Sequence, residues 1–274
     1  IDKATNLEAI AKALNIGLDA LVLLDDNPAE RAQVRKALPM VRVPEVPDDA
    51  AWFAWTLEAG GWFEAVTFSA EDADRVKMQA QDVRRAELMS GARDLTDYLR
   101  SLGMTISFRP FDAQGRQRIV QLINKTNQFN LTTRRYTEAQ VSEMEAAPSV
   151  LTLQVRLTDR FGDLGMIAVI IGRSHPEHSS VLELDSWLMS CRVLGRQVEA
   201  ATLSVIAARA KEMGIASLLG TYIPTDKNML VENHYGKLGF TRAAGEPDGR
   251  TIWELDLASY EPPAFPMTLS VDET

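Results

Sequence analysis

Two stretches of the sequence combine side chains and backbone that suit the binding of an anionic or polyhydroxylated ligand. The first, "NKTNQFNLTTRRYT" at residues 124–137, is rich in amides, hydroxyls and arginines. These groups can hydrogen-bond a polyhydroxylated or phosphorylated ligand. A polar surface loop would have the same composition, so both interpretations stay open. The candidate substrate-binding residues are Asn127, Asn130, Thr132 and Arg134.

The second stretch, "RVLGRQ" at residues 192–197, precedes a long helical pattern. Backbone N–H groups at a helix N-terminus, helped by the helix dipole, hold a phosphate or pyrophosphate. Gly195 lets a ligand approach the backbone closely, whereas the side chain of Gln197 leaves less room for the ligand. The alternative is a glycine-containing turn that feeds a core helix. The candidate ligand-binding residues are Arg192, Val193, Leu194, Gly195, Arg196 and Gln197.

The remaining reactive residues give weaker signals. Cys191 ends the strand before this loop, where an exposed thiol of lowered pKa could relay a thioester; an inert apolar cysteine is the commoner case. A single cysteine forms no internal disulfide. His175, His178 and His234 do not cluster with it at the spacing of metal ligands, and "SHPEHSS" has the composition of a turn.

Composition sets the class of protein. A length of 274 residues favours two domains, and 46% hydrophobic with 24% charged residues is typical of a soluble globular protein. No apolar run approaches the ~20 residues of a membrane span, and no basic-then-apolar leader appears, so we expect a cytoplasmic protein without membrane association. The net charge of −9 argues against nucleic-acid binding. Because the chain opens on "IDKATNLEAI" without methionine, we expect a fragment of something longer.

The first hundred residues predict part of an α/β domain and a linker. Apolar residues at helical spacing predict a helix that ends before Gly17, and "ALVLLDD" predicts a short buried strand ending in two carboxylates. Asn27 before Pro28 has the form of an N-cap, so a helix begins there and runs to about Leu38. Residues 1–66 are the first predicted domain and residues 67–103 a helical linker.

A second domain is predicted over residues 104–260. "MTISFRPFD" indicates a strand, residues 114–124 a helix, and Thr137 the cap of another helix. Three strands follow, then a long helix ended by Gly214, the strand "SLLGTYIPT", a helix ended by Gly239 and the strand "RTIWELDL". The proline-containing residues 261–274 are predicted to form an irregular tail.

This order of elements resembles the GNAT acyltransferase fold. Arg192 and Gly195 match the anion-binding signature of that family, while Gln197 stands where a small residue is expected. Asn228 and Tyr235, followed by Gly239 and Phe240 in "YIPTDKNMLVENHYGKLGF", match a second signature. The resemblance implies that residues 192–197 hold a phosphopantetheine thioester or CoA. It also implies that Asn228 and Tyr235 are catalytic, with the tyrosine protonating the departing thiolate; a tyrosine packed beneath the helix is the alternative.

Several longer motifs together resemble the FkbH-like family. They are "LLDDNPAER", "VRVPEVPDD", "NKTNQFNLTTRRYT", "DRFGDLG", "LMSCRVLGRQVE" and "YIPTDKN", and they run from residue 2 to about residue 257. Members of that family join a haloacid-dehalogenase-type (HAD-like) phosphatase domain to a GNAT-like domain. The resemblance implies loading of a glyceryl unit from a small phosphorylated three-carbon donor onto an acyl carrier protein.

The HAD-like half is only partly present. The resemblance implies that Asp25 and Asp26 bind Mg²⁺, which prefers oxygen ligands, and that Lys3 offsets phosphate charge. The nucleophilic aspartate of the phosphatase superfamily has no counterpart in this chain, so we expect no phosphatase activity from it.

The predicted fold class is therefore α/β (α+β mixed), with a GNAT-like acyltransferase domain after the C-terminal remnant of a HAD-like Rossmannoid domain. The predicted function is transfer of a glyceryl or related small acyl group to the phosphopantetheine thiol of an acyl carrier protein. One alternative is an N-acyltransferase that uses acyl-CoA on an amino sugar. The other is a non-catalytic module that docks the carrier protein.

Overall fold

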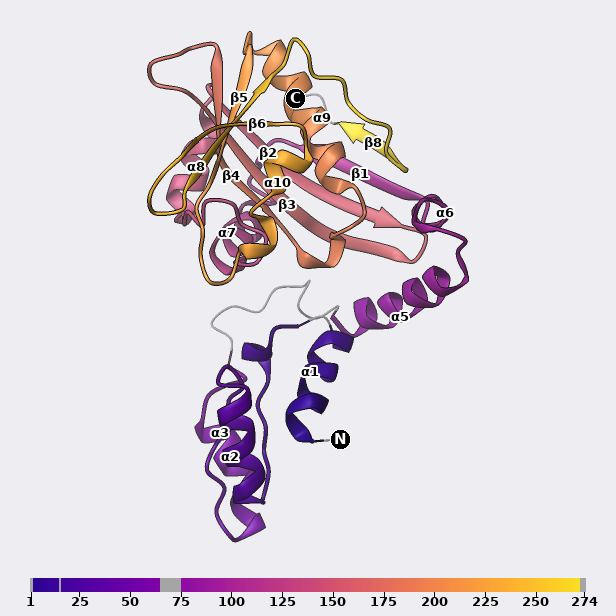
Figure 1. The fold of residues 1–274 in the computed structure, drawn as a ribbon, viewed down its shortest axis with the longest axis vertical. Helices are drawn as coiled ribbons and strands as arrows, with labels where there is room; N and C mark the ends of the chain where they lie inside the picture. Colours follow the sequence, from indigo (N-terminus) through magenta and orange to yellow (C-terminus); the bar gives the residue numbers. More distant parts are fainter. Residues whose placement is uncertain (1, 15, 65–74, 272–274) are drawn as a thin grey trace. The chain divides into compact units, whose positions relative to one another are not determined.

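The computed structural model describes residues 2–14, 16–64 and 75–271. The chain divides into two compact units, which we call the N-terminal unit (Ile1–Gln79) and the C-terminal unit (Ala80–Thr274) (Figure 1). The division falls inside helix α5 (Arg75–Gly91), which lies within the stretch that the sequence predicts as a helical linker.

The N-terminal unit contains short helices around a small apolar core. Asn27 caps the second of them: its side chain accepts a hydrogen bond of 2.9 Å from the backbone N–H of Ala29, and Pro28 follows, as the sequence predicts. The core brings together Leu7, Val34 and Val41. The elements are α1 (Lys3–Leu14), η1 (Leu18–Ala20), α2 (Pro28–Ala37), η2 (Ala50–Trp52) and α3 (Phe53–Ala59).

The predicted strand in "ALVLLDD" is wrong in extent. These residues make only one parallel bridge, between Val22 and Arg42, with hydrogen bonds from Leu23 N–H to Arg42 C=O and from Arg42 N–H to Leu21 C=O. The partner segment is short because Pro44 follows it, and proline has no N–H to continue the pairing.

One mixed sheet forms the centre of the C-terminal unit. Its strand order is β6-β7-β5-β4-β3-β2-β1-β8, with parallel pairing of β4 with β5 and of β1 with β8, and antiparallel pairing elsewhere. The mixed α/β class predicted from the sequence is confirmed. The strands are β1 (Met104–Arg109), β2 (Val150–Asp159), β3 (Gly162–Ser174), β4 (Val181–Met189), β5 (Ser217–Tyr222), β6 (Thr241–Gly245), β7 (Thr251–Asp256) and β8 (Met267–Val271).

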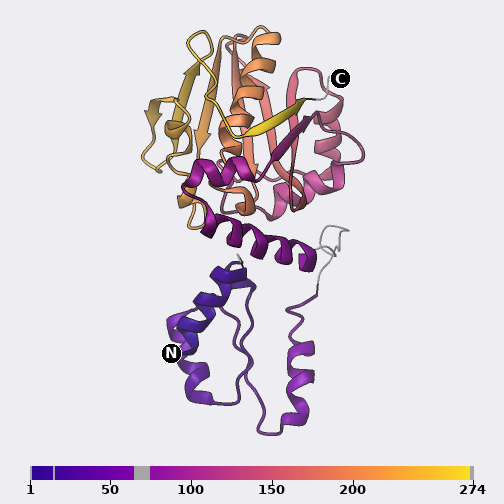
Figure 2. The same cartoon turned by 90° about the vertical axis from the view of Figure 1, so that its right-hand side faces the viewer.

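Helices cover both faces of the sheet, so its central strands are buried on both sides. Ile167 and Ile170 of β3 belong to the core that includes α9, whereas Val169 and Ile171 belong to a second core with α7 and α8 (Figures 1 and 2). This explains the unbroken apolar run in β3. None of the described helices is long and apolar enough to cross a membrane. The helices are α6 (Leu95–Ser101), α7 (Arg116–Lys125), α8 (Glu138–Ala146), η3 (Cys191–Val193), α9 (Val198–Glu212), η4 (Met229–Val231) and α10 (His234–Lys237).

The predicted irregular tail is wrong for residues 267–271. They form β8, which pairs in parallel with β1 from Met104 opposite Met267 to Phe108 opposite Val271. The pairing is favourable because Met267 and Leu269 pack against the larger core while the backbone satisfies the outer edge of β1. The short edge strand β6 is a further element that the sequence did not predict.

Strands β4 and β5 separate part-way along their length. Their parallel pairing runs only from Val181 opposite Ser217 to Leu184 opposite Gly220, and Asp185 is the extra residue of a bulge in β4. Beyond it, the loop after α7 enters the gap: Leu131 N–H donates to Trp187 C=O (3.2 Å), Met189 N–H to Phe129 C=O (3.0 Å) and Ile223 N–H to Leu131 C=O (2.8 Å). Phe129 is thereby fixed at the opening between the two strands.

Candidate active site

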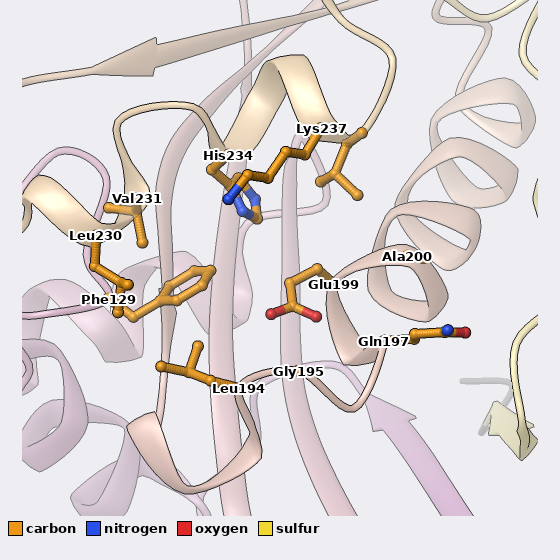
Figure 3. Close-up of a pocket in the computed structure, with 11 residues that line it drawn as sticks. Phe129, Leu194, Gly195, Gln197, Glu199, Ala200, Leu230, Val231, His234 and Lys237 are labelled. Atoms are coloured by element: carbon orange, nitrogen blue, oxygen red, sulfur yellow. The ribbon is translucent and has the colours of Figure 1, made fainter. Parts of the chain in front are cut away.

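A cavity of about 390 Å³ lies at this opening in the C-terminal unit. It is lined by the loop before α9, the first turn of α9, the segment η4–α10, and Phe129 (Figure 3). The wall is mostly apolar, but Glu199, His234 and Lys237 also reach it. The lining residues are Phe129, Leu194, Gly195, Gln197, Glu199, Ala200, Leu230, Val231, His234, Lys237 and Leu238.

The loop before α9 has the backbone of a ligand-binding turn. Gly195 has a φ of +75°, and a Cβ atom built on it would meet nothing within 4 Å, so a ligand has room there. Gln197 also has a left-handed backbone, with φ of 63°, which disfavours a side chain by about 1 kcal/mol. Its side chain is exposed and points away from Glu199 in Figure 3. That the Gln197 side chain leaves less room for an anion at the loop stays a prediction.

Arg196 does not offer its side chain to a ligand. It is 8% exposed and lies 3.3 Å from Asp159, which Arg85 also holds through two hydrogen bonds of 2.7 and 2.8 Å. The charge of Arg196 is therefore buried and paired. Binding of a phosphopantetheine thioester or CoA at Arg196 stays a prediction. The Arg192 side chain is only partly buried and donates from Nε to the Ser190 hydroxyl at 3.3 Å.

The side chain of Asn228 connects two backbone segments through hydrogen bonds. It is fully buried, and its amide nitrogen donates to the backbone carbonyls of Asn130 and Ile223, both at 2.9 Å. Its amide oxygen accepts from the Thr225 N–H at 2.7 Å and from the Tyr222 hydroxyl at 3.4 Å. Both amide hydrogens and both lone-pair directions are thus in use. In this structure no polar group of the amide is left for a substrate, and a catalytic role of Asn228 stays a prediction.

We expect Asn228→Ala to lower the free energy of unfolding by about 2–3 kcal/mol, because it leaves buried backbone groups without partners. Urea unfolding followed by circular dichroism measures this. The matched control is Asn233→Ala, since Asn233 is exposed and its side chain makes no capping hydrogen bond to α10, and it should change stability by less than about 0.5 kcal/mol. Full stability of Asn228→Ala with lost activity would support the catalytic interpretation.

Tyr235 lies in the core and does not line the cavity. It is 0% exposed, and its ring occupies the space left by Gly220, where a Cβ atom would come within 2.4 Å of the ring. Burial, with a smaller contribution from the charge of Glu183, raises the pKa of its hydroxyl, which therefore holds its proton more tightly. The structure brings His234, the preceding residue, to the cavity instead. Protonation of a thiolate by Tyr235 stays a prediction.

The predicted substrate-binding residues bind mainly to the protein itself. Asn130 is buried and accepts from the Thr133 N–H at 2.8 Å, and the Thr132 hydroxyl donates to the Asp185 carbonyl at 2.8 Å. Arg134 pairs with the Asp185 carboxylate, and the Arg135 guanidinium donates to the side chain of Asn127. These contacts fix the loop that carries Phe129. Substrate binding by Asn127, Asn130, Thr132 and Arg134 stays a prediction.

Glu199 and His234 are candidate functional residues that sequence reasoning missed, because both line the cavity. Figure 3 shows the Glu199 carboxylate and the His234 ring entering the same cavity from α9 and α10. Burial raises the pKa of Glu199 against the opposing charge of Lys237. Burial, followed by the charge of Lys237, lowers the pKa of His234 to about 3. The available signals were a carboxylate in the first turn after an anion-binding loop, and a histidine next to the recognised tyrosine.

The N-terminal unit holds the residues expected to bind Mg²⁺ and phosphate. Lys3 contacts the Asp25 carboxylate directly, and this contact is the first cause of the lowered pKa of Asp25; Asp26 is exposed. The described residues contain no group of three or more His, Cys, Asp or Glu that could hold a metal ion. Binding of Mg²⁺ by Asp25 and Asp26 stays a prediction. The partly buried thiol of Cys191 is outside the cavity lining.

No family model matches the sequence, and no curated protein is similar to it. Among solved structures, the GNAT domain of S. lividans PAT is 20% identical, with a TM-score of 0.43 over 54% of this chain and 89% of that chain. Aminoglycoside acetyltransferase AAC(6')-Ib in complex with coenzyme A is 16% identical, with a TM-score of 0.41 over 55% and 94%.

A third similarity falls on a shorter part of the chain. The N-terminal part of protein BF1531 from Bacteroides fragilis, which contains a phosphatase domain complexed with Mg, is 44% identical, with a TM-score of 0.24. The match covers 25% of this chain and 18% of that chain. Acetyltransferase folds thus match about half of this chain, and a phosphatase-domain structure matches a quarter.

Proposed function

We propose that the C-terminal unit transfers a small acyl group to and from the thiol of a phosphopantetheine arm. The observation that carries the proposal is the cavity itself. The cavity brings together the predicted anion-binding loop and a long apolar wall. The carboxyl group of Glu199, whose pKa is raised, and the buried imidazole of His234 also reach it. Its volume of about 390 Å³ suits a slender arm rather than a bulky ligand, since ligand sites hold roughly 300–1,000 Å³.

The arm and the cavity have complementary polarity. Leu194, Leu230 and Leu238 give the apolar wall that the methylene and dimethyl groups of pantetheine would contact. At the loop, Gly195 and the first turn of α9 offer backbone N–H groups to a phosphate. Lys237 supplies a positive charge at the same cavity. A thiol would then lie inside, near Glu199 and His234.

Glu199 is the proton acceptor of the proposed reaction. A general base works best when its pKa lies near the working pH, and burial moves the Glu199 pKa in that direction. The attacking thiol gives its proton to the Glu199 carboxylate as its sulfur bonds to the acyl carbonyl carbon. When the carbon bond to the first sulfur breaks, the departing thiolate takes that proton. Atoms, electrons and charge therefore balance, and the carboxylate is regenerated.

We favour an acyl carrier protein over free CoA as the molecule that carries the phosphopantetheine arm. CoA adds a pyrophosphate and a further phosphate, which require more positive charge, and the Arg196 charge is already paired with Asp159. A carrier arm has a single phosphodiester. Because the whole chain has a net charge of −9, docking of an acidic carrier requires a local group of cations, for which Arg134, Arg135 and Arg192 are candidates.

The acyl group is proposed to be glyceryl or a related small polar acyl group. The amides and hydroxyls of residues 124–137 lie on the loop that delivers Phe129 to the cavity, so a polar acyl group would lie beside them. Supply of this group by a small phosphorylated three-carbon donor belongs to a complete phosphatase domain with Mg²⁺. The described residues of the N-terminal unit hold no group of three or more His, Cys, Asp or Glu that could bind the metal.

Calorimetric titration of the chain with holo acyl carrier protein and with CoA tests the proposal. We expect binding of the carrier that weakens as salt rises towards 0.15 M, where the screening length is about 8 Å, and little binding of CoA. Lys237→Ala should weaken carrier binding, whereas Lys211→Ala, an exposed lysine at the far end of α9, should not. Mass spectrometry should then show exchange of a glyceryl group between carrier and free pantetheine.

Two results would contradict the proposal. Tight CoA binding without carrier binding would favour an N-acyltransferase with an amine acceptor. Carrier binding without any acyl exchange would favour a docking module.

A further inference from the structure

Three aromatic side chains at or next to the cavity each have a buried polar atom without a hydrogen-bond partner among the residues that the structure describes. They are Nε1 of Trp187, Nε2 of His234 and the hydroxyl of Tyr235. The rings contact one another: the centroid of His234 lies 4.6 Å from that of Trp187 and 5.4 Å from that of Tyr235. An unpartnered buried polar atom costs about 1–3 kcal/mol, so it calls for an explanation.

Only His234 of these three lines the cavity. It is 6% exposed and is held edge-on against Trp187 and against Phe129, whose centroid lies 5.1 Å away. Such ring contacts fix the orientation of the imidazole but leave Nε2 without a partner. A buried nitrogen at the wall of a ligand cavity, on a ring that cannot turn easily, is a pre-positioned hydrogen-bonding group.

We propose that His234 is a catalytic residue, whose Nε2–H group donates a hydrogen bond to the carbonyl oxygen of the bound acyl group. This inference rests on the acyl transfer proposed above. As the thiol sulfur bonds to the carbonyl carbon, the C=O electron pair moves onto oxygen, where the His234 hydrogen bond stabilises it. The pair returns to reform C=O as the bond to the leaving sulfur breaks. His234 keeps its proton throughout.

The charge state of His234 fits a donor rather than an acid. Its pKa is lowered to about 3 by burial and by Lys237, so the imidazole is neutral at physiological pH. A neutral imidazole still has one N–H to donate, and the structure leaves Nε2 without a partner among the described residues. The titratable groups around it are Glu199 on α9 and Lys237 and Tyr235 on α10. Burial raises the pKa of the Glu199 carboxyl group.

The test is acyl exchange by the full chain between glyceryl-loaded carrier protein and pantetheine. His234→Leu keeps an apolar ring cage but removes the donor, and should lower kcat about 10²–10³-fold with little change in carrier affinity. His234→Gln retains an amide N–H at a similar reach and should recover part of the rate. His178→Gln, at an exposed turn position, is the matched control and should leave kcat unchanged.

A spectroscopic measurement separates this role from packing. The infrared carbonyl stretch of a ¹³C-labelled glyceryl thioester should shift to lower frequency when it binds the wild-type chain and His234→Gln, but not His234→Leu. A carbonyl stretch that shifts equally in all three, or an unchanged kcat in His234→Leu, would overturn the inference while leaving the proposed function intact. A wild-type chain that neither binds nor exchanges the thioester would instead contradict the proposed function.

Discussion

Glu199→Gln is expected to lower kcat for acyl exchange about 10²–10⁴-fold, the usual contribution of a positioned general base. Glutamine keeps the size of the side chain and its place in the first turn of α9, but it cannot accept the thiol proton. Because the base acts as the carboxylate and burial raises its pKa, wild-type kcat should rise with pH through that raised pKa. The variant should lose this limb of the pH profile.

The same substitution should change ligand preference and stability. The substitution removes one negative charge from the cavity, so the anionic CoA should bind more tightly to Glu199→Gln than to the wild type. A raised carboxyl pKa means that the folded state holds the proton more strongly than the unfolded state. That contribution to stability is present below the unfolded pKa and is lost as pH rises through the folded pKa. Glu199→Gln should therefore be at least as stable as the wild type at pH 8.

Steady-state kinetics across pH 5–9, calorimetry with CoA and thermal unfolding measure these three effects. Glu212→Gln is the matched control, because it changes an exposed carboxylate at the other end of the same helix. Retention of kcat and of its pH dependence in Glu199→Gln would remove Glu199 from the mechanism. Loss of kcat together with a large loss of stability would indicate a structural role instead.

Asp159→Asn is expected to lower the free energy of unfolding by about 3–5 kcal/mol, as is typical when one partner of a buried ion pair is removed. The Asp159 carboxylate is 0% exposed and accepts two hydrogen bonds from Arg85, an ion-pair contact from Arg196 and a 2.9 Å hydrogen bond from the Phe161 N–H. Without its charge, the buried Arg196 guanidinium loses its ion-pair partner, and the buried Arg85 guanidinium retains only its contact of 2.8 Å with Asp82. Because Arg196 belongs to the loop before α9, the variant should also weaken carrier binding.

A surface ion pair gives the matched control. Arg156 and Asp163 approach to 3.2 Å with side chains 39% and 53% exposed, so Asp163→Asn should change stability by about 0–1 kcal/mol. Burial opposes ionisation of Asp159, but Arg85 and the Phe161 N–H hold its pKa below the ordinary value. Its contribution is therefore present above the unfolded pKa of about 4 and is lost as pH falls through the folded pKa.

Urea unfolding of both variants at pH 7 and at low pH measures the difference. Equal stability of Asp159→Asn and Asp163→Asn at pH 7 would contradict the buried-network interpretation.

Local features of the sequence determined much of this fold. Asn27 with Pro28 begins α2, and Thr137 with Gln140 forms the capping box of α8, because these signals act over three or four residues. The unbroken apolar run in β3 reports burial on both faces of the sheet, and so the mixed α/β class follows from pattern alone. The tail strand β8 was missed because its partner, β1, is remote in sequence.

The roles of the site residues depended on tertiary structure. Successive residues of a helix point about 100° apart, so His234 can face the cavity while Tyr235 enters the core, and the sequence does not say which face is which. The resemblance to a known signature selected Tyr235 and Asn228 by residue type. In the structure, the Tyr235 ring packs against Gly220, and four hydrogen bonds hold the side chain of Asn228. Burial and pairing arise only when distant segments meet, and they determine which polar group is left to bind a ligand.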